Sequence, residues 1–110
     1  MDCADPLPVA QFYLAATQGA MVREDADGVW IRFDGNDVIF RRVDGYRAPT
    51  WPHADEQMQV HFDFWVDDTA AARETLERLG ARTADVQPHD PSLLLVMVDP
   101  AGHLFCVGPR

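Results

Sequence analysis

Lysine is absent from this sequence, and all nine basic residues are arginines. Without a lysine amine, the chain cannot form a Schiff base with a carbonyl compound, and it cannot build the lysine-dependent phosphate loop of nucleotide-binding proteins. Serine is almost absent too, because Ser92 is the only one. Its neighbours Asp90, Pro91 and Leu93 supply no glycine for a nucleophile elbow, which excludes a serine hydrolase of that kind.

Long apolar runs are missing as well. The longest, residues 93–98, has six residues, whereas a membrane-spanning helix needs about 20. The first residues, MDCADP, lack the basic flank and apolar stretch of a secretion signal, so we expect a cytoplasmic protein. In that reducing compartment the two cysteines, Cys3 and Cys106, are expected to be free thiols rather than a disulfide.

Positive charge is scarce: 18 acidic residues stand against 9 basic ones, which gives a formal net charge of -9 at pH 7. Nucleic acids and anionic membrane surfaces attract basic patches, so neither is an expected partner. The 110 residues, of which 47% are hydrophobic, are enough to bury one core and too few for two. The chain is therefore expected to be one globular domain.

Two segments have the apolar spacing of amphipathic helices. The first, residues 5–20, begins near two prolines and is expected to end at Gly19 in the left-handed conformation. The second, residues 67–81, is expected to be capped by Asp68 or Thr69 and to end at Gly80. The predicted buried stripes are Val9, Phe12, Tyr13 and Ala16 in the first helix and Ala72, Leu76 and Leu79 in the second.

Runs typical of β-strands surround each helix. One short run precedes the first helix and a longer one precedes the second, and three runs follow each helix. The predicted strands are 1–4, 20–24, 29–33 and 37–43 in the first half and 59–66, 81–86, 93–98 and 104–107 in the second. The order strand, helix, three strands therefore occurs twice.

This repeat predicts an α+β fold of two βαβββ modules, residues 1–43 and 59–110, joined by a linker at 44–58. Neither module can bury its sheet alone. We therefore expect a curved, mostly antiparallel eight-stranded sheet around a cleft, with two outer helices, and a homodimer as the assembly. The cleft is the expected ligand site.

Several motifs, taken in order along the chain, are typical of one known family. They are Phe12-Tyr13, Pro49-Thr50-Trp51-Pro52, His61-Phe62-Asp63 leading into Val66-Asp67-Asp68, Leu79-Gly80-Ala81, and Asp99-Pro100-Ala101-Gly102-His103-Leu104-Phe105-Cys106. In this order the sequence resembles the glyoxalase-like domains of the vicinal oxygen chelate superfamily, which includes glyoxalases, bleomycin resistance proteins and dioxygenases. The resemblance implies paired modules around a funnel-shaped cavity, frequent dimers, and either metal-dependent enzymes or metal-free antibiotic-binding proteins.

The resemblance also implies where a metal ion would be held. Catalytic members place a His in the first strand, a Glu in the fourth, a His in the fifth and a Glu in the eighth. Here the fifth-strand position is His61, the fourth falls on or next to Phe40, the eighth falls on Cys106, and the first would precede Met1. An open metal site generally needs three protein ligands, so we expect no metal of the family type and no cofactor.

Side chains alternate along the strand that contains His61. The residues His61, Asp63 and Trp65 occupy one face, and apolar residues occupy the other, which suits a helix. On the cleft side, His61 would act as a proton shuttle or as a hydrogen-bond partner of the ligand, and Asp63 would tune its pKa. Alternatively, the two residues form a polar cluster that satisfies its own hydrogen bonds. A mixed metal site made of His61, Asp63 and Cys106 is a further alternative.

The sequence thus predicts metal-free binding of a small molecule by six residues. They are His61, Asp63, Trp65, Phe40, Cys106 and Trp51. The alternative is a glyoxalase- or dioxygenase-type enzyme, a lyase or isomerase, that uses His61 as acid/base or as metal ligand. A third hypothesis limits the domain to oligomer assembly. Arg32, Arg41 and Arg42 are expected on a solvated outer face rather than as a carboxylate clamp.

Overall fold

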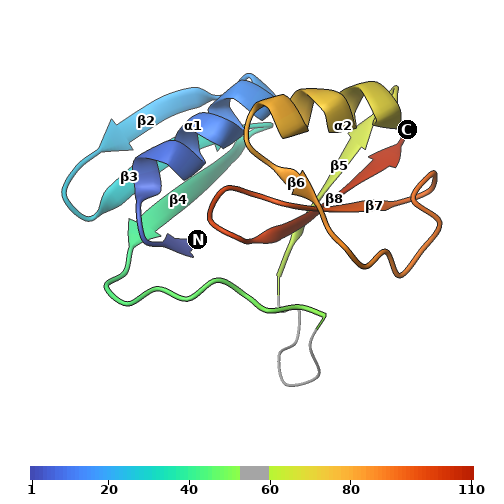
Figure 1. Cartoon of the computed structure of the whole chain (residues 1–110). Coiled ribbons are helices and arrows are strands. Elements are labelled where there is room, and N and C mark those ends of the chain that lie inside the picture. Colours follow the sequence, from blue (N-terminus) through green and yellow to red (C-terminus); the bar gives the residue numbers. More distant parts are fainter. Residues whose placement is uncertain (53–59) are drawn as a thin grey trace. The chain divides into compact units, whose positions relative to one another are not determined.

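The computed structural model describes residues 1–52 and 60–110, which form two compact units, Met1–Ala48 and Pro49–Arg110 (Figure 1). Each unit is a βαβββ module, so the predicted α+β class and the two-module organisation are confirmed. The described strands are hydrogen-bonded into two four-stranded sheets rather than into one continuous ladder of eight. Residues 53–58 of the predicted linker, and Gln59 of the predicted strand, lie outside the described residues.

Unit 1 contains β1 (Asp2–Cys3), α1 (Pro6–Thr17), β2 (Ala20–Glu24), β3 (Gly28–Phe33) and β4 (Asn36–Arg42). Its sheet has the order β1-β4-β3-β2, with β1 parallel to β4 and the other pairs antiparallel. The two antiparallel pairs are joined by short turns, whereas the parallel strands β1 and β4 are separated along the chain by α1, β2 and β3.

The core of unit 1 lies between α1 and the sheet. Tyr13 of α1 is fully buried, and its ring stacks on those of Phe33 and Phe40, with centroid distances of 6.4 and 5.4 Å. The predicted helical stripe is confirmed, since Val9 and Phe12 are buried beside Tyr13. These aromatic contacts fix the helix on β3 and β4.

The end of α1 differs from the expectation. The left-handed residue is Gln18, with φ of 54°, and Gly19 does not take this role. Gly19 is needed for space instead, because a Cβ at this position would lie 2.7 Å from the carbonyl oxygen of Arg32. The glycine therefore lets the start of β2 approach β3 closely.

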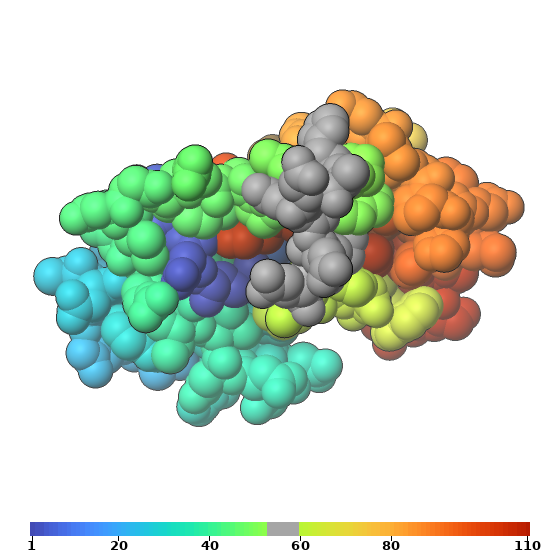
Figure 2. All heavy atoms as spheres, turned by 90° about the horizontal axis from the view of Figure 1, so that it is seen from below, coloured from blue at the N-terminus to red at the C-terminus, as the bar shows by residue number. Residues whose placement is uncertain are grey.

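The arginines of β3 and β4 are exposed and ion-paired. Arg32 donates from a guanidinium nitrogen to Asp37 at 2.9 Å, and Arg41 pairs with Asp2 at 3.0 Å. Side-chain exposures of 58% for Arg32 and 65% for Arg41 agree with the predicted solvated outer face. In the space-filling view of Figure 2, the cyan to green residues of β3 and β4 form part of the visible surface of unit 1.

Unit 2 contains β5 (Phe62–Val66), α2 (Thr69–Arg78), β6 (Arg82–Thr83), β7 (Leu95–Val98) and β8 (Leu104–Pro109). Its strand order, β5-β8-β7-β6, repeats that of unit 1, again with a parallel pair, β5 and β8, connected through a helix. Within the described residues, neither helix is long and apolar enough to cross a membrane.

Helix α2 begins and ends as its sequence predicts. The carboxylate of Asp68 accepts a hydrogen bond from the amide of Ala71 at 3.0 Å, which caps the first turn. After the last turn, Gly80 adopts a positive φ of 110°, a conformation that favours glycine.

Strand β6 is shorter than the predicted 81–86 because a side chain replaces part of the ladder. The amide group of Gln87 donates to the carbonyl oxygens of Ala84 and Val96, each at 2.9 Å, and accepts from the amide of Val96 at 2.9 Å. Backbone groups beyond Thr83 are therefore satisfied without regular strand pairing.

Candidate functional site

The sheet of unit 2 has two chemically different faces. Along β5, Asp63 and Trp65 are exposed, while Phe62 and Phe64 are half-buried on the opposite side. Strand β8 pairs with β5 so that Cys106 lies opposite Asp63, and neighbouring residues in register point to the same side. We call the side of β5 and β8 that carries His61, Asp63, Trp65 and Cys106 the His61 face.

The other side of the sheet is apolar. The rings of Phe64 and Phe105 meet edge to face with centroids 5.9 Å apart. Helix α2, which contacts β8 and β6, lies over one side of the sheet (Figure 1). The apolar side supplies the surface that the half-buried stripe of α2 requires.

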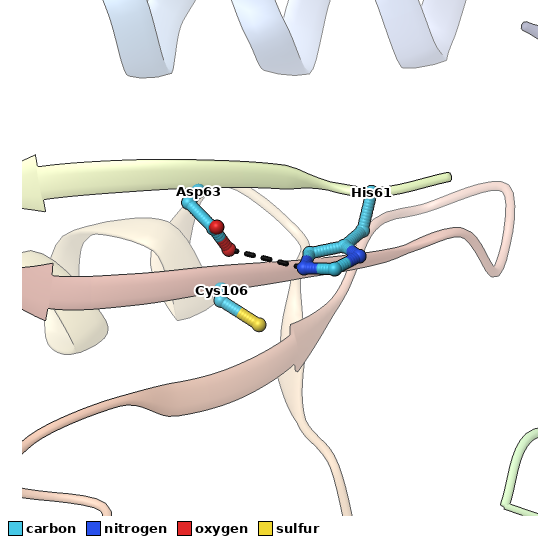
Figure 3. A group of neighbouring side chains, drawn as sticks. All are labelled: His61, Asp63 and Cys106. Atoms are coloured by element: carbon cyan, nitrogen blue, oxygen red, sulfur yellow. Dashed lines mark ion pairs between the residues drawn. The ribbon is translucent and has the colours of Figure 1, made fainter. Parts of the chain in front are cut away.

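Three side chains on the His61 face converge. The Nε2 atom of His61 lies 3.2 Å from Oδ1 of Asp63. One imidazole nitrogen of His61, one carboxylate oxygen of Asp63 and the sulfur of Cys106 all lie within 4.8 Å of one another. Figure 3 shows the imidazole and the carboxylate leaving the β5 segment toward the same space as the sulfur from β8. Sequence alternation predicted that His61 and Asp63 share a face, and the mixed site considered from the sequence also included Cys106. The strand register places Cys106 opposite Asp63.

The three groups differ in access to solvent. The side chains of His61 and Asp63 are 34% and 43% exposed, whereas Cys106 is 3% exposed. Burial, followed by the negative charge of Asp63 and a hydrogen bond to Asp63, raises the pKa of the Cys106 thiol to about 11. At neutral pH the thiol is therefore protonated, and it is a weak nucleophile in this state.

Trp65 lies on the same side of β5 as Asp63. It is paired with Gly108 of β8, where an added Cβ would stand 2.6 Å from Cζ3 of the indole. The residue is still 55% exposed. A glycine within a strand often marks a place where another group approaches closely, so the glycine at position 108 is the sequence feature from which this contact could have been predicted.

Trp51 is half-buried against a cluster of buried residues that includes Cys106. The cluster consists of Ala84, Val96, Val98, Leu104 and Cys106, and Leu94 packs against it as well. The structure thus brings Trp51 to the group of residues around Cys106.

Phe40 has different surroundings. It belongs to β4 of unit 1, is fully buried, and stacks on Tyr13 of α1. Burial alternates along β4, with Val38 and Phe40 inside and Ile39 outside. This placement gives Phe40 a role in packing beneath α1 in place of the predicted ligand contact.

His103, a neighbour of Cys106 in sequence, is engaged in a turn. Its Nδ1 lies 3.0 Å from Oδ2 of Asp99, and the other carboxylate oxygen accepts from the amides of Ala101 and His103 at 2.8 and 3.0 Å. Asp99 is buried, with 4% exposure. This role of Asp99 was not predicted from the sequence, although an Asp-Pro-Ala-Gly turn is typical of a side chain that binds its own loop.

The residues present do not fit the metal ion that the family resemblance implies. That ion is held by imidazole and carboxylate groups at four positions. The fourth-strand position, Phe40, offers no donor atom, and the eighth-strand position offers the protonated thiol of Cys106. A hard divalent ion that prefers oxygen ligands therefore lacks its ligand set here.

Comparison with known proteins agrees with this fold. A family model described as "Glyoxalase-like domain" matches residues 1–108. No curated protein is significantly similar to the chain.

Solved structures of very different sequence share the architecture. A glyoxalase/bleomycin resistance protein/dioxygenase family enzyme from Burkholderia phytofirmans PsJN has a TM-score of 0.74 at 11% identity, over 99% of this chain and 93% of its own. The genomically encoded fosfomycin resistance protein FosX from Listeria monocytogenes has a TM-score of 0.72 at 13% identity, over 100% and 88%. A glyoxalase/bleomycin resistance protein from Albidiferax ferrireducens T118 has a TM-score of 0.66 at 16% identity, over 100% and 93%.

Proposed function

Because this chain belongs to the family of glyoxalase-like domains, we propose that it binds a small organic molecule on the His61 face without the four-ligand metal ion of the family's catalytic members. One observation carries the proposal: three exposed side chains, His61, Asp63 and Trp65, gather on one side of β5. Exposed aromatic and polar groups beside a buried apolar cluster are typical of a small-molecule site.

Each of these groups has a distinct task in binding. Trp65 is 55% exposed and presents a flat apolar ring on which a planar or apolar part of the ligand stacks. Asp63 accepts hydrogen bonds from the ligand, and His61 donates or accepts one. The half-buried Trp51 and the cluster around Cys106 supply the apolar floor.

A second candidate function, an acid/base enzyme, is favoured by the contact between His61 and Asp63. At 3.2 Å, the carboxylate orients the imidazole, as an acid/base pair requires. In that case, His61 transfers a proton to or from the bound molecule. The two candidates differ in whether the molecule leaves the site chemically changed.

Native mass spectrometry of the EDTA-treated protein tests the first candidate. Fosfomycin and bleomycin, which the names of the similar structures mention, are screened with a library of small metabolites. We expect a one-to-one complex that Trp65→Ala and Asp63→Asn weaken and that Ile39→Ala, an exposed change in unit 1, leaves intact. A screen without any complex, or a complex insensitive to both site variants, contradicts the proposal.

The same samples test the enzyme. Each bound compound is recovered and compared by mass with the starting compound. Turnover that depends on pH, and that is lost in His61→Ala, supports acid/base catalysis. A reaction that is unaffected in His61→Ala rejects this role for His61.

A cytoplasmic location and a homodimer complete the proposal. In the described part of the chain, Cys3 and Cys106 are buried thiols that form no disulfide, which suits a reducing compartment. Edge strand β2 exposes the apolar side chains of Met21 and Val22, which a second copy would cover. Light scattering that reports a strict monomer contradicts the dimer.

A further inference from the structure

Most of the family's metal ligands are missing from this chain, but the His61 face still carries atoms that can bind a metal ion. Where the catalytic members of the family carry imidazole and carboxylate groups, this chain brings together one imidazole nitrogen, one carboxylate oxygen and one sulfur, all within 4.8 Å. The donor set differs from that of the family, and it comes from the β5 segment and β8 alone.

We propose that His61, Asp63 and Cys106 form a binding site for a thiophilic divalent cation of the zinc class, with the fourth coordination position open to solvent. The proposal does not depend on the small-molecule function, because the ion alone is the ligand. It differs from the family's site in its ligands. His61 is the shared one, Cys106 stands at the eighth-strand position in place of a glutamate, and Asp63 on β5 is at none of the family's four positions.

The distances favour a tetrahedral ion. In such a site, ligand atoms at about 2.0 to 2.3 Å from zinc stand roughly 3.3 to 3.6 Å from one another. The distance from Nε2 of His61 to Oδ1 of Asp63 is already 3.2 Å. The sulfur of Cys106 lies within 4.8 Å of one imidazole nitrogen of His61 and of one carboxylate oxygen of Asp63, so a shift of about 1 Å in the ligand atoms completes the set.

The charges of the three ligands suit a divalent cation. A divalent ion neutralises one thiolate and one carboxylate while imidazole binds as a neutral ligand. Binding therefore releases the thiol proton to solvent and leaves the site with no net charge.

The donor types select the metal. Thiolate favours zinc and other thiophilic ions, whereas magnesium and manganese prefer oxygen ligands. The exposure of His61 and Asp63 leaves room for water as the fourth ligand, which is the arrangement of catalytic rather than structural zinc sites. The buried Cys106 anchors the ion on the sheet side.

Calorimetric titration of the EDTA-treated protein with zinc chloride, and optical titration with cobalt chloride, tests the site without any organic compound. We expect one ion per chain and a near-ultraviolet thiolate-to-cobalt absorption band. Removing a ligand in His61→Ala, Asp63→Asn or Cys106→Ser lowers the affinity by more than about 10-fold, because outer-sphere partners alone are worth that much.

Two matched variants serve as controls. Cys3→Ser changes the other buried thiol and His89→Ala changes an exposed loop histidine, and both should bind zinc as the wild type does. Asp63→Asn keeps the size of the side chain, and the circular dichroism of each variant verifies its fold. Failure to bind zinc, equal affinity for manganese, or a cobalt band that survives Cys106→Ser overturns the proposal. None of these outcomes bears on the binding of an organic molecule by the EDTA-treated protein.

Discussion

The indole of Trp65 lies so close to Gly108 that a side chain at residue 108 has no room beneath it, with only 2.6 Å between an added Cβ and Cζ3 of the ring. The ring can therefore lie over β8 only because residue 108 has no Cβ. Because Trp65 is 55% exposed, it can be displaced toward solvent without a collapse of the core.

Gly108→Ala should push Trp65 off the sheet. We expect a loss of stability of about 1 to 2 kcal/mol and a shift in tryptophan fluorescence. Part of the cost arises from the carbonyl oxygen of Leu93, which would lie 3.1 Å from the new Cβ. In a Trp65→Ala background the same change should cost less, and a double-mutant cycle with chemical denaturation measures the difference. Purely additive effects would show that the ring is not held by this contact.

Asp99→Ala should destabilise the turn between β7 and β8. The buried carboxylate accepts two backbone hydrogen bonds and contacts the imidazole of His103, so its removal leaves amides without their acceptor. A loss of about 1 to 3 kcal/mol is expected in urea unfolding. Asp90→Ala is the control, since Asp90 bonds Ser92 in an exposed loop, and a similar loss there would contradict the argument from burial.

Phe40→Ala should cost about 3 to 5 kcal/mol, because it opens a cavity beneath Tyr13. Phe40→Leu should cost less and should leave any ligand affinity unchanged, since the ring packs inside unit 1. Ile39→Ala, on the exposed side of the same strand, controls for effects on β4 itself. A Phe40→Leu protein that keeps its stability but loses binding would restore Phe40 as a ligand contact.

The Cys106 thiol should make stability depend on pH in the alkaline range. Its pKa is raised from 9.0 to about 11, so the unfolded chain releases the proton at lower pH than the folded one. The contribution is present below pH 9 and is lost as the pH rises toward 11, by roughly 2 to 3 kcal/mol. The measurement is the difference in unfolding free energy between the wild type and Cys106→Ala, both in EDTA. A difference that stays constant from pH 8 to 11 would contradict the raised pKa.

Local pattern was enough to predict most of the fold. Period-2 alternation placed His61, Asp63 and Trp65 on one side of β5, and the Asp68 cap and Gly80 gave the two ends of α2. These features depend on residues that are neighbours in the chain, so the sequence contains all the information that they need.

Long-range register could not be predicted in the same way. Cys106 stands opposite Asp63 because β5 pairs in parallel with β8, and no local pattern specifies which residues of distant strands align. The expectation for Phe40 relied on its position in the family pattern, whereas its packing depends on the tight turn at Asp34 and Gly35 that sets which side of β4 meets α1. For Gly19, the crowding by Arg32 became visible only with β3 in place.

The two sheets of the described chain are self-contained, since each keeps its first strand beside its fourth and shares no strand with the other. A cut between residues 48 and 49 would therefore break the covalent chain without removing a rung from either ladder. Produced as two polypeptides, each fragment would still carry a full set of pairing partners for its backbone.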